Sequence, residues 1–265
     1  MKIGKIKAIL PFLLLAVMMV SSCDFTSQLA SNQGNTEIKV SRMDRIEYQY
    51  ITTGEFSALQ QMSTVYPTET RTLIEDILKI GKMDEEATTH RMLSFYQDST
   101  LQSVIRDAEE KFANMDNLNK ELTAAFKKVN ELFPQIAMPT VYSQIMAFDQ
   151  SVVIKDGSIG ISLDKYLGSD YPAYQEFFDE KQRKKMTPKM IVPDCVLFYL
   201  INSFPLRDFA KATQEQKDEH IGKMLWVTNQ IVGFRAFDDA PLERVEQYVK
   251  KNPDVTIHEL LGEEE

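Results

Sequence analysis

The sequence predicts an α+β protein that is predominantly α-helical, with a helical N-terminal half, a small antiparallel β meander and a helical C-terminal half. Three observations support this class. Apolar residues recur with a helical period from Glu55 to Phe133. The period changes to two between Val141 and Leu163, and helical patterning returns after Thr187. Because the strands are grouped rather than alternating with helices, the order favours α+β over repeated βαβ units.

Four helices are expected in the N-terminal half, each with one apolar face and a polar residue at its start. The side chains that could cap these helices are Thr68, Asp84, Asp98 or Ser99, and Asp116. Gly81 is expected to end the first helix and Pro134 to end the fourth, because proline cannot continue a helix.

The meander is expected to span Val141–Phe148, Val152–Lys155 and Ser158–Leu163. The last two segments flank Asp156-Gly157, which is a strong signal for a type I′ hairpin turn. Apolar and small polar residues alternate along the final segment, so we expect this sheet to be packed on one face only.

The C-terminal half should begin with a helix starting at Thr187-Pro188 or at Pro193-Asp194, since proline suits the first helical turn. The stretch Val196–Ile201 is apolar on all sides, which predicts a central helix. Three more helices are expected at Gln214–Phe234, Asp239–Tyr248 and Pro253–Leu261.

The N-terminus has the layout of a secretory signal with a lipoprotein cleavage site. Three lysines precede an apolar run from Ala8 to Val20, which is shorter than the roughly 20 residues of a spanning helix. Ser21 and Ser22 then precede Cys23, as small residues do at a cleavage site. We therefore expect residues 1–22 to be a signal peptide and Cys23 to be lipidated, for example with palmitate. The alternative is an ordinary signal that leaves Cys23 free.

Lipidation of Cys23 predicts a protein that is attached to the membrane through its N-terminal lipid. Residues 23–41 are polar and weakly patterned, so they are expected to form a lipidated flexible tether. Residues 42–265 are then expected to form a single α+β domain. This arrangement places the chain in the cell envelope, facing the periplasm, on the inner or the outer membrane.

Composition narrows the choice of partners. The net charge of the 265-residue chain is −9, and no basic stripe is present, which argues against nucleic-acid binding. Cys195 is the only other cysteine and lies in an apolar run, so we expect a buried, unreactive thiol.

No catalytic, metal-binding or cofactor-binding motif is complete. A zincin needs two histidines and a glutamate in the pattern H-E-x-x-H, but after His258-Glu259 the second histidine position is Gly262. His90 and His220 have no such partners either. The serine-nucleophile pattern G-x-S-x-G and the phosphate-binding glycine motifs are missing. We therefore predict no catalytic residue, metal or cofactor, although paired carboxylates of the glycosidase type remain an open alternative.

Aromatic residues cluster from Tyr166 to Phe178, directly after the last strand. Such a cluster could line a ligand groove. The residues considered for this groove are Asp164, Tyr166, Asp170, Tyr171 and Tyr174. The alternative is a loop that its rings attach to the hydrophobic core.

The stretch IGISLDKYLGSDYPAY (residues 159–174) resembles the gliding-motility-associated lipoprotein B family of Bacteroidota. LFPQIAMPTVYSQIMAF (residues 132–148) is similar to that family's entry into its sheet, and Arg42–Arg45 is similar to its opening R-F-D-R segment. YVKKNPDVTIHELL (residues 248–261) resembles its closing helix pair. The resemblance extends over residues 38–261.

The resemblance implies a lipid-anchored envelope protein that supports the motility and secretion machinery. It also implies a distant, degenerate zincin-like fold, although Thr187–Phe204 contains no histidine that could bind a metal. We therefore expect a non-catalytic accessory or interaction module with an envelope protein as its partner. The alternatives are a peptidase-like hydrolase with a degenerate metal site, and a module that binds cell-wall fragments or peptides.

Overall fold

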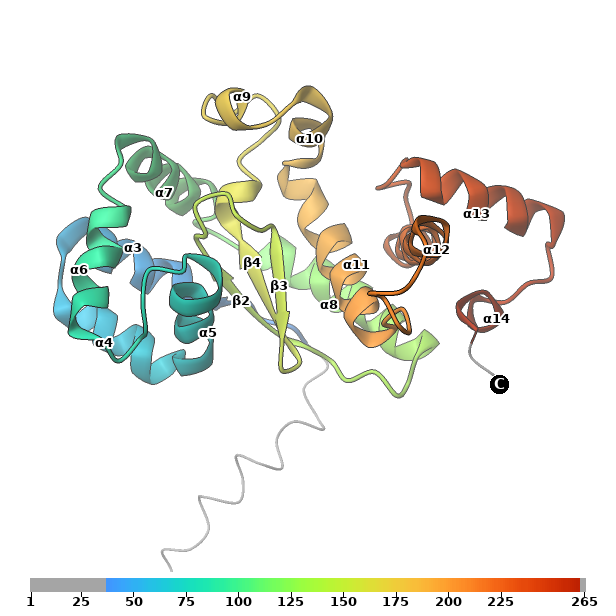
Figure 1. Cartoon of the computed structure of the whole chain (residues 1–265), viewed down its shortest axis with the longest axis horizontal. Helices are drawn as coiled ribbons and strands as arrows, with labels where there is room; N and C mark the ends of the chain where they lie inside the picture. The colour runs from blue at the N-terminus through green and yellow to red at the C-terminus, as the bar shows by residue number, and fades with distance from the viewer. Residues whose placement is uncertain (1–36, 263–265) are drawn as a thin grey trace, which may run out of the picture. The chain divides into compact units, whose positions relative to one another are not determined.

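The computed structural model describes residues 37–262, in which helices precede and follow one small sheet (Figure 1). The predicted class, predominantly helical α+β, is confirmed. Within this part of the chain, no helix is both long and apolar enough to cross a membrane. The predicted signal peptide, Cys23 and most of the predicted tether lie outside the described residues.

The N-terminal helices are more numerous than the sequence pattern suggests. They are α3 (Met43–Thr53), α4 (Phe56–Val65), α5 (Pro67–Arg71), the π-helical segment η2 (Thr72–Ile77), α6 (Glu86–Phe95), α7 (Ser99–Lys111) and α8 (Asp116–Leu132). Asp98 caps α7 as predicted, because its carboxylate accepts the backbone N–H groups of Thr100 and Leu101 at 2.9 and 3.1 Å.

The predicted caps Thr68, Asp84 and Asp116 are wrong, and Asp116 is instead the first residue of α8, after the N-cap residue Met115. Helix α5 begins one residue earlier than Thr68, at Pro67, whose fixed φ suits the first helical position. Helix α6 begins at Glu86, after a turn that contains Asp84. In both cases the turn that precedes the helix, rather than a capping side chain, sets the helix start.

The sheet is mixed, which corrects the expectation of an antiparallel meander. Its strands are β1 (Ser41–Arg42), β2 (Thr140–Gln144), β3 (Val152–Lys155) and β4 (Ser158–Ser162), in the order β1-β2-β4-β3. Only β3 and β4 are antiparallel, whereas β2 is parallel to both β1 and β4. The positive φ angles of Asp156 (50°) and Gly157 (77°) confirm the predicted hairpin turn. An alternating pattern marks a strand but does not determine its neighbour, so the parallel pairs were missed.

Both faces of the sheet are covered, which corrects the expectation of one packed face. Along β4 the neighbouring side chains of Ile161 and Ser162 are both fully buried. Gly160 allows this close packing: a Cβ atom there would lie 2.5 Å from the Tyr142 hydroxyl and 2.7 Å from the Gln144 amide nitrogen. In Figure 1, helices α3 to α7 lie on one side of the sheet, and α8 lies with α11 and α12 on the other.

The C-terminal half surrounds the predicted central helix. Its elements are the 3₁₀ turn η3 (Leu163–Lys165), α9 (Tyr174–Phe177), α10 (Glu180–Lys185), the 3₁₀ turn η4 (Pro188–Met190), α11 (Ile191–Ser203), α12 (Gln214–Val232), α13 (Ala240–Lys251) and α14 (Ile257–Leu261). Helix α11 packs against β3, β4, α8 and α12, as its apolar sequence predicts. The proposed start at Thr187-Pro188 is close to the observed one, because Pro188 opens the 3₁₀ turn that leads directly into α11. The alternative start at Pro193-Asp194 is wrong, since both residues lie inside α11, which begins at Ile191.

The chain is already docked before residue 42. Ile38 and Val40 are buried, and their backbone N–H groups donate to the Thr123 hydroxyl and to Asn119 of α8 at 2.9 and 3.0 Å. The end of the predicted tether, residues 37–41, therefore belongs to the folded unit. Ile38 and Val40 alternate with polar residues, but two apolar residues are too short a pattern to predict this packed segment from the sequence.

Candidate functional site

The surface is hollowed beyond the C-terminal end of β2. This hollow has a volume of about 660 Å³, and we call it the Phe148 groove. It is bounded by four segments: residues 77–78 at the end of η2, residues 95–101 between α6 and α7, residues 146–149 after β2, and residues 176–178 of α9 and its end. Most of its lining is apolar, and the phenylalanines Phe95 and Phe177 are 37% and 54% exposed.

The loop after β2 has an unusual backbone. Ala147 and Phe148 are consecutive residues with positive φ angles of 51° and 67°, a region that L-residues with side chains rarely adopt. Such strain costs on the order of 1–3 kcal/mol per residue and persists only where surrounding contacts impose it. Here the loop turns the Phe148 ring into the groove.

Asp164 holds this loop in place. Its carboxylate accepts the backbone N–H groups of Met146 at 3.1 Å and Phe148 at 2.6 Å, and the Ser162 hydroxyl at 2.6 Å. The neighbouring Lys165 donates to the Phe148 carbonyl at 3.2 Å, and its ammonium lies 4.2 Å from the centre of the Phe178 ring. The Asp-Lys pair at the end of β4 therefore fixes one wall of the groove.

Burial has the largest effect on the pKa values of Asp164 and Lys165. The fully buried position of Asp164 raises its pKa, against the effect of the hydrogen bonds that it accepts. Burial lowers the pKa of Lys165, partly offset by the nearby carboxylates, of which Asp164 has the largest effect. Asp164 is the acceptor in these three hydrogen bonds, as an ionised carboxylate must be, because it has no proton to donate.

The tyrosines predicted to line a groove lie behind it instead. Tyr166 and Tyr174 are buried. The Tyr166 hydroxyl donates to Asp194 of α11 at 2.8 Å. The Tyr174 hydroxyl accepts the Leu167 N–H at 2.9 Å and donates to the Asp164 carbonyl. These rings attach the loop to the core, which is the alternative interpretation of the aromatic cluster.

The two remaining predicted residues lie nearer the surface. Tyr171 is partly buried and donates to Asp107 of α7 at 2.8 Å, which links the loop to the N-terminal half. Asp170 is exposed. None of the five predicted residues lines the Phe148 groove, but Asp164 and Tyr174 support the backbone and rings that do.

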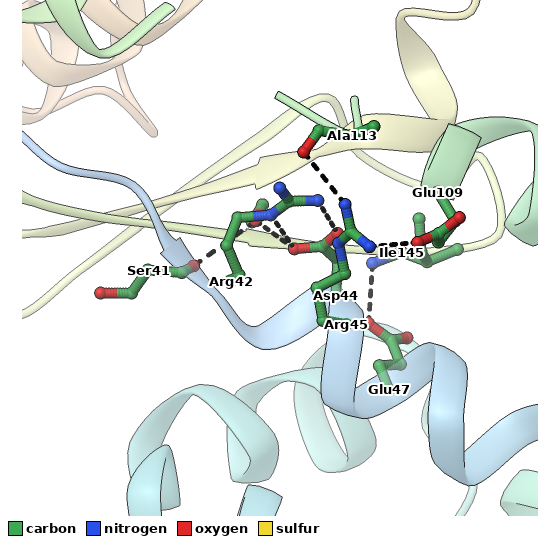
Figure 2. Close-up of polar contacts among 9 residues, drawn as sticks. Ser41, Arg42, Asp44, Arg45, Glu47, Glu109, Ala113 and Ile145 are labelled. Carbon is green, nitrogen blue, oxygen red and sulfur yellow. Dashed lines mark hydrogen bonds and ion pairs between the residues drawn. The ribbon is translucent and has the colours of Figure 1, made fainter. Parts of the chain in front are cut away.

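The segment that begins at Arg42 joins the start of α3 to the sheet, as Figure 2 shows. Arg42 forms a two-point ion pair with Asp44, at 2.9 and 2.7 Å. Asp44 is buried and also accepts the hydroxyl of Ser143 on β2. An acidic residue in the first turn of a helix is stabilised by the helix dipole, so Asp44 is well placed for this role.

The same segment also reaches α7 and the groove loop. Arg45 pairs with Glu109 and donates to the Ala113 carbonyl at 3.2 Å (Figure 2). Glu47 is fully buried and accepts the backbone N–H of Ile145 at 2.9 Å, the residue that precedes the groove loop. Burial raises the pKa of Glu47 well above its ordinary range, and the carboxylate of Asp164 adds to this shift.

Glu47 and its partner Tyr96 were missed in the sequence. The Tyr96 hydroxyl donates to the Ile145 carbonyl at 2.8 Å and lies 3.2 Å from the Glu47 carboxylate. One signal was present: Asp44 and Glu47 are three residues apart, so both lie on the face of α3 that carries Met43 and Tyr50. Charged residues on an apolar face indicate buried polar contacts.

The buried carboxylates are hydrogen-bonded to groups of the protein itself. Asp44, Glu47 and Asp164 are at most 3% exposed and accept hydrogen bonds from the protein itself. Across residues 37–262, no three His, Cys, Asp or Glu side chains are placed to hold one metal ion. Burial raises the pKa of Asp194 to about 7, and the Cys195 thiol beside it is buried with a raised pKa.

In two other hollows on the described surface, most of the charged residues form ion pairs within the protein. Between α12, α13 and α14, Lys223 pairs with Glu219, and Arg244 pairs with Asp218. Near α10, Lys184 pairs with Glu180, and Lys185 pairs with Asp239. The Phe148 groove differs because exposed rings, rather than internal ion pairs, make up its surface.

A family model described as "Gliding motility protein GldB" matches residues 26–236 of the chain. The chain belongs to this family. Membership indicates a gliding-motility-associated lipoprotein and suggests association with the cell envelope. The match spans the Arg42 segment, the whole Phe148 groove and α11. No curated protein and no solved structure matches the chain.

Proposed function

We propose that this member of the GldB family is a non-catalytic accessory module, anchored to the membrane through a lipid on Cys23. In this proposal the Phe148 groove binds a segment of an envelope protein partner. The observation that carries the proposal is the groove itself: the rings of Phe95 and Phe177 are exposed on its walls, beside the strained loop at Ala147-Phe148 that the interior holds in place.

Exposed phenylalanines around a concavity support binding. A single exposed apolar side chain is ordinary, but several around one hollow are typical of interaction sites. Phe148 packs with its ring centre 6.0 Å from those of both Phe177 and Phe178. These three rings form one continuous surface that a partner could cover.

The position of the groove supports a protein partner rather than the anchoring membrane. Strands β1 and β2 are parallel, so Glu37, where the described chain begins, and the loop at residues 146–149 lie at opposite ends of the sheet. A lipid attached at Cys23 would join the folded unit at the end away from the groove. The groove is then free to meet another protein.

The contacts of the acidic residues support a role without catalysis. A general acid or base must reach the substrate within hydrogen-bonding distance. Asp164 and Glu47 are fully buried, and backbone N–H groups occupy their carboxylates. Substitution of Asp164 or Glu47 should therefore lower the stability of the fold rather than remove a catalytic group.

The experiment is site-specific photocrosslinking in the source cells. A photoreactive phenylalanine analogue is placed at Phe177 in the full chain and, as a matched control, at Phe209, which is 62% exposed on a different segment. We expect one discrete crosslinked protein from position 177 and none from position 209. We also expect Phe177→Ala to reduce gliding or protein secretion, while Phe209→Ala does not.

Two outcomes would contradict the proposal. Equal crosslinking from positions 177 and 209 would show that the Phe148 groove has no special role. Cleavage of a peptide library by the purified chain, abolished by Asp194→Asn without loss of folding, would instead support the hydrolase alternative.

A further inference from the structure

We infer that the Phe148 groove takes a peptide segment in which lysine or arginine is interspersed with apolar residues. This inference rests on the proposed function and specifies the chemistry of the partner. It follows from the distribution of charge around the groove, from the exposed aromatic rings and from the apolar lining.

The charged residues that line the groove are all acidic, and Lys165 lies at its edge over the Phe178 ring. Asp98, Asp149 and Glu176 line the groove, and no lysine or arginine does. Asp149 and Glu176 are exposed, and neither is among the ion pairs formed within residues 37–262. Asp98 caps α7 through one carboxylate oxygen, which leaves the other oxygen available. The groove is therefore complementary to a cation.

The aromatic rings fit the same ligand. A cation over a ring face is attracted by the ring electrons, and the aliphatic stem of lysine or arginine packs on the ring. The protein already contains one such contact at the edge of the groove, where the Lys165 ammonium lies 4.2 Å from the Phe178 ring centre. The neighbouring Phe177 ring is 54% exposed and could receive a cation from a partner.

The apolar lining explains why the segment also needs apolar residues. Leu78, Leu101 and Ala147 are partly exposed apolar residues of the lining, alongside the aromatic rings and the carboxylates. A purely basic peptide would leave the apolar lining exposed to water, whereas apolar residues between the cations would bury it. Charge would then provide orientation and selectivity, and apolar contact would provide most of the affinity.

The experiment selects peptides on the intact chain. Full-length lipidated protein in phosphatidylcholine nanodiscs is the target for a display library of random twelve-residue peptides. Peptides that bind the wild type but not Phe177→Ala are sequenced. We expect lysine and arginine to be enriched among them, alternating with apolar residues, and glutamate and aspartate to be depleted.

Affinity measurements then test the charges directly. For the most enriched peptide, the double variant Asp149→Asn/Glu176→Gln should raise Kd by roughly tenfold, as expected for two partly exposed ion pairs. The matched control Glu110→Gln/Asp254→Asn removes two exposed carboxylates elsewhere and should leave Kd unchanged. Replacing the basic residues of the peptide with glutamine should weaken binding to a similar extent.

The outcomes separate this inference from the proposed function. If the selected peptides depend on Phe177 but carry no excess of cations, or bind the double variant equally well, the inference is wrong and the proposed function stands. If no peptide depends on Phe177, the peptide-binding role of the groove fails as well. Dimers in mass photometry that Phe177→Ala abolishes would identify a second copy of the chain as the occupant and overturn the inference.

Discussion

Asp149 belongs to the loop that follows β2 and Asp164 binds that loop from the interior, so their surroundings give them different roles. Asp164 is fully buried and accepts two backbone N–H groups of the loop. Asp149 is exposed at the groove. An aspartate therefore supports the loop from the interior at position 164, whereas the aspartate at position 149 could contact a partner.

Asp164→Asn should lower the free energy of unfolding by about 2–3 kcal/mol, because an amide cannot accept all three hydrogen bonds and a buried donor is left unsatisfied. Urea denaturation monitored by circular dichroism would measure this. The exposed Asp170→Asn is the control and should change stability by less than about 0.5 kcal/mol. Equal stabilities of the two variants would show that Asp164 does not hold the loop.

The free energy of unfolding should change with pH because of the raised pKa of Asp194. Burial raises its pKa to about 7 in the folded state from an ordinary value of 3.8. The folded state therefore binds more protons than the unfolded state between pH 4 and pH 7, so this group's contribution is full below pH 4 and is lost as the pH rises to 7. Since Asp194 is partly exposed, we expect a loss of about 2 kcal/mol rather than the full shift.

Asp194→Asn should remove this part of the pH dependence. The variant should be at least as stable as the wild type at pH 8, because an amide oxygen can still accept the Tyr166 hydroxyl. Denaturation curves at pH 4, 5.5, 7 and 8 would measure the difference between the two proteins. A difference that does not change over this range would contradict the assigned pKa.

The groove forms because of how the elements around it are connected, and their lengths matter less. The loop after β2, the 3₁₀ turn η3 and α9 meet because the ends of β2 and β4 lie side by side in a parallel pair. The groove is thus built at the carboxyl ends of parallel strands, where loops from separate segments come together.

At the same scale, Gly222 determines how closely α12 and α13 pack. A Cβ atom there would lie 2.4 Å from the carbonyl oxygen of Pro241 in α13. Gly222→Ala should gain about 1 kcal/mol in helix propensity but lose more through the backbone clash, for a net destabilisation of about 1–2 kcal/mol. Gln230→Ala, at an exposed site on the same helix, should be neutral or slightly stabilising.

Hydrogen exchange would locate the effect of Gly222→Ala. Faster exchange should appear in α13, because only that helix must move away to accommodate the methyl group. Unchanged exchange in α13 together with wild-type stability would contradict the predicted close packing.

For the molecule as a whole, the proposed function assigns separate purposes to the lipid on Cys23 and to the Phe148 groove. The lipid would fix the chain to a membrane, and the groove would select its partner. Family membership is consistent with this division, because the match includes both the groove and the sequence shortly after Cys23.

Cys23→Ala should move the protein from the detergent phase to the aqueous phase in Triton X-114 partitioning, because two or more acyl chains are what make an anchor stable. Cys195→Ala is the matched control: its thiol is buried in α11, so partitioning should not change. Detergent partitioning that survives Cys23→Ala would contradict lipidation at this residue.

The sequence by itself determined the class of fold, the hairpin at Asp156-Gly157, the central helix and the family. These features depend on local periodicity, turn chemistry and short motifs, which neighbouring residues along the chain encode. Asp98 was predicted correctly as a cap for the same reason, since a cap bonds to residues two and three positions away.

Only the tertiary structure decided the strand order, the burial of the tyrosines and the location of the groove. The partners of Asp164 and Glu47 lie from 2 to about 100 residues away, so no local pattern distinguishes these carboxylates from surface ones. The groove combines segments from residue 77 to residue 178, which become neighbours only when the parallel strands align. A binding surface formed by distant segments depends on packing, and packing is a property of the folded chain.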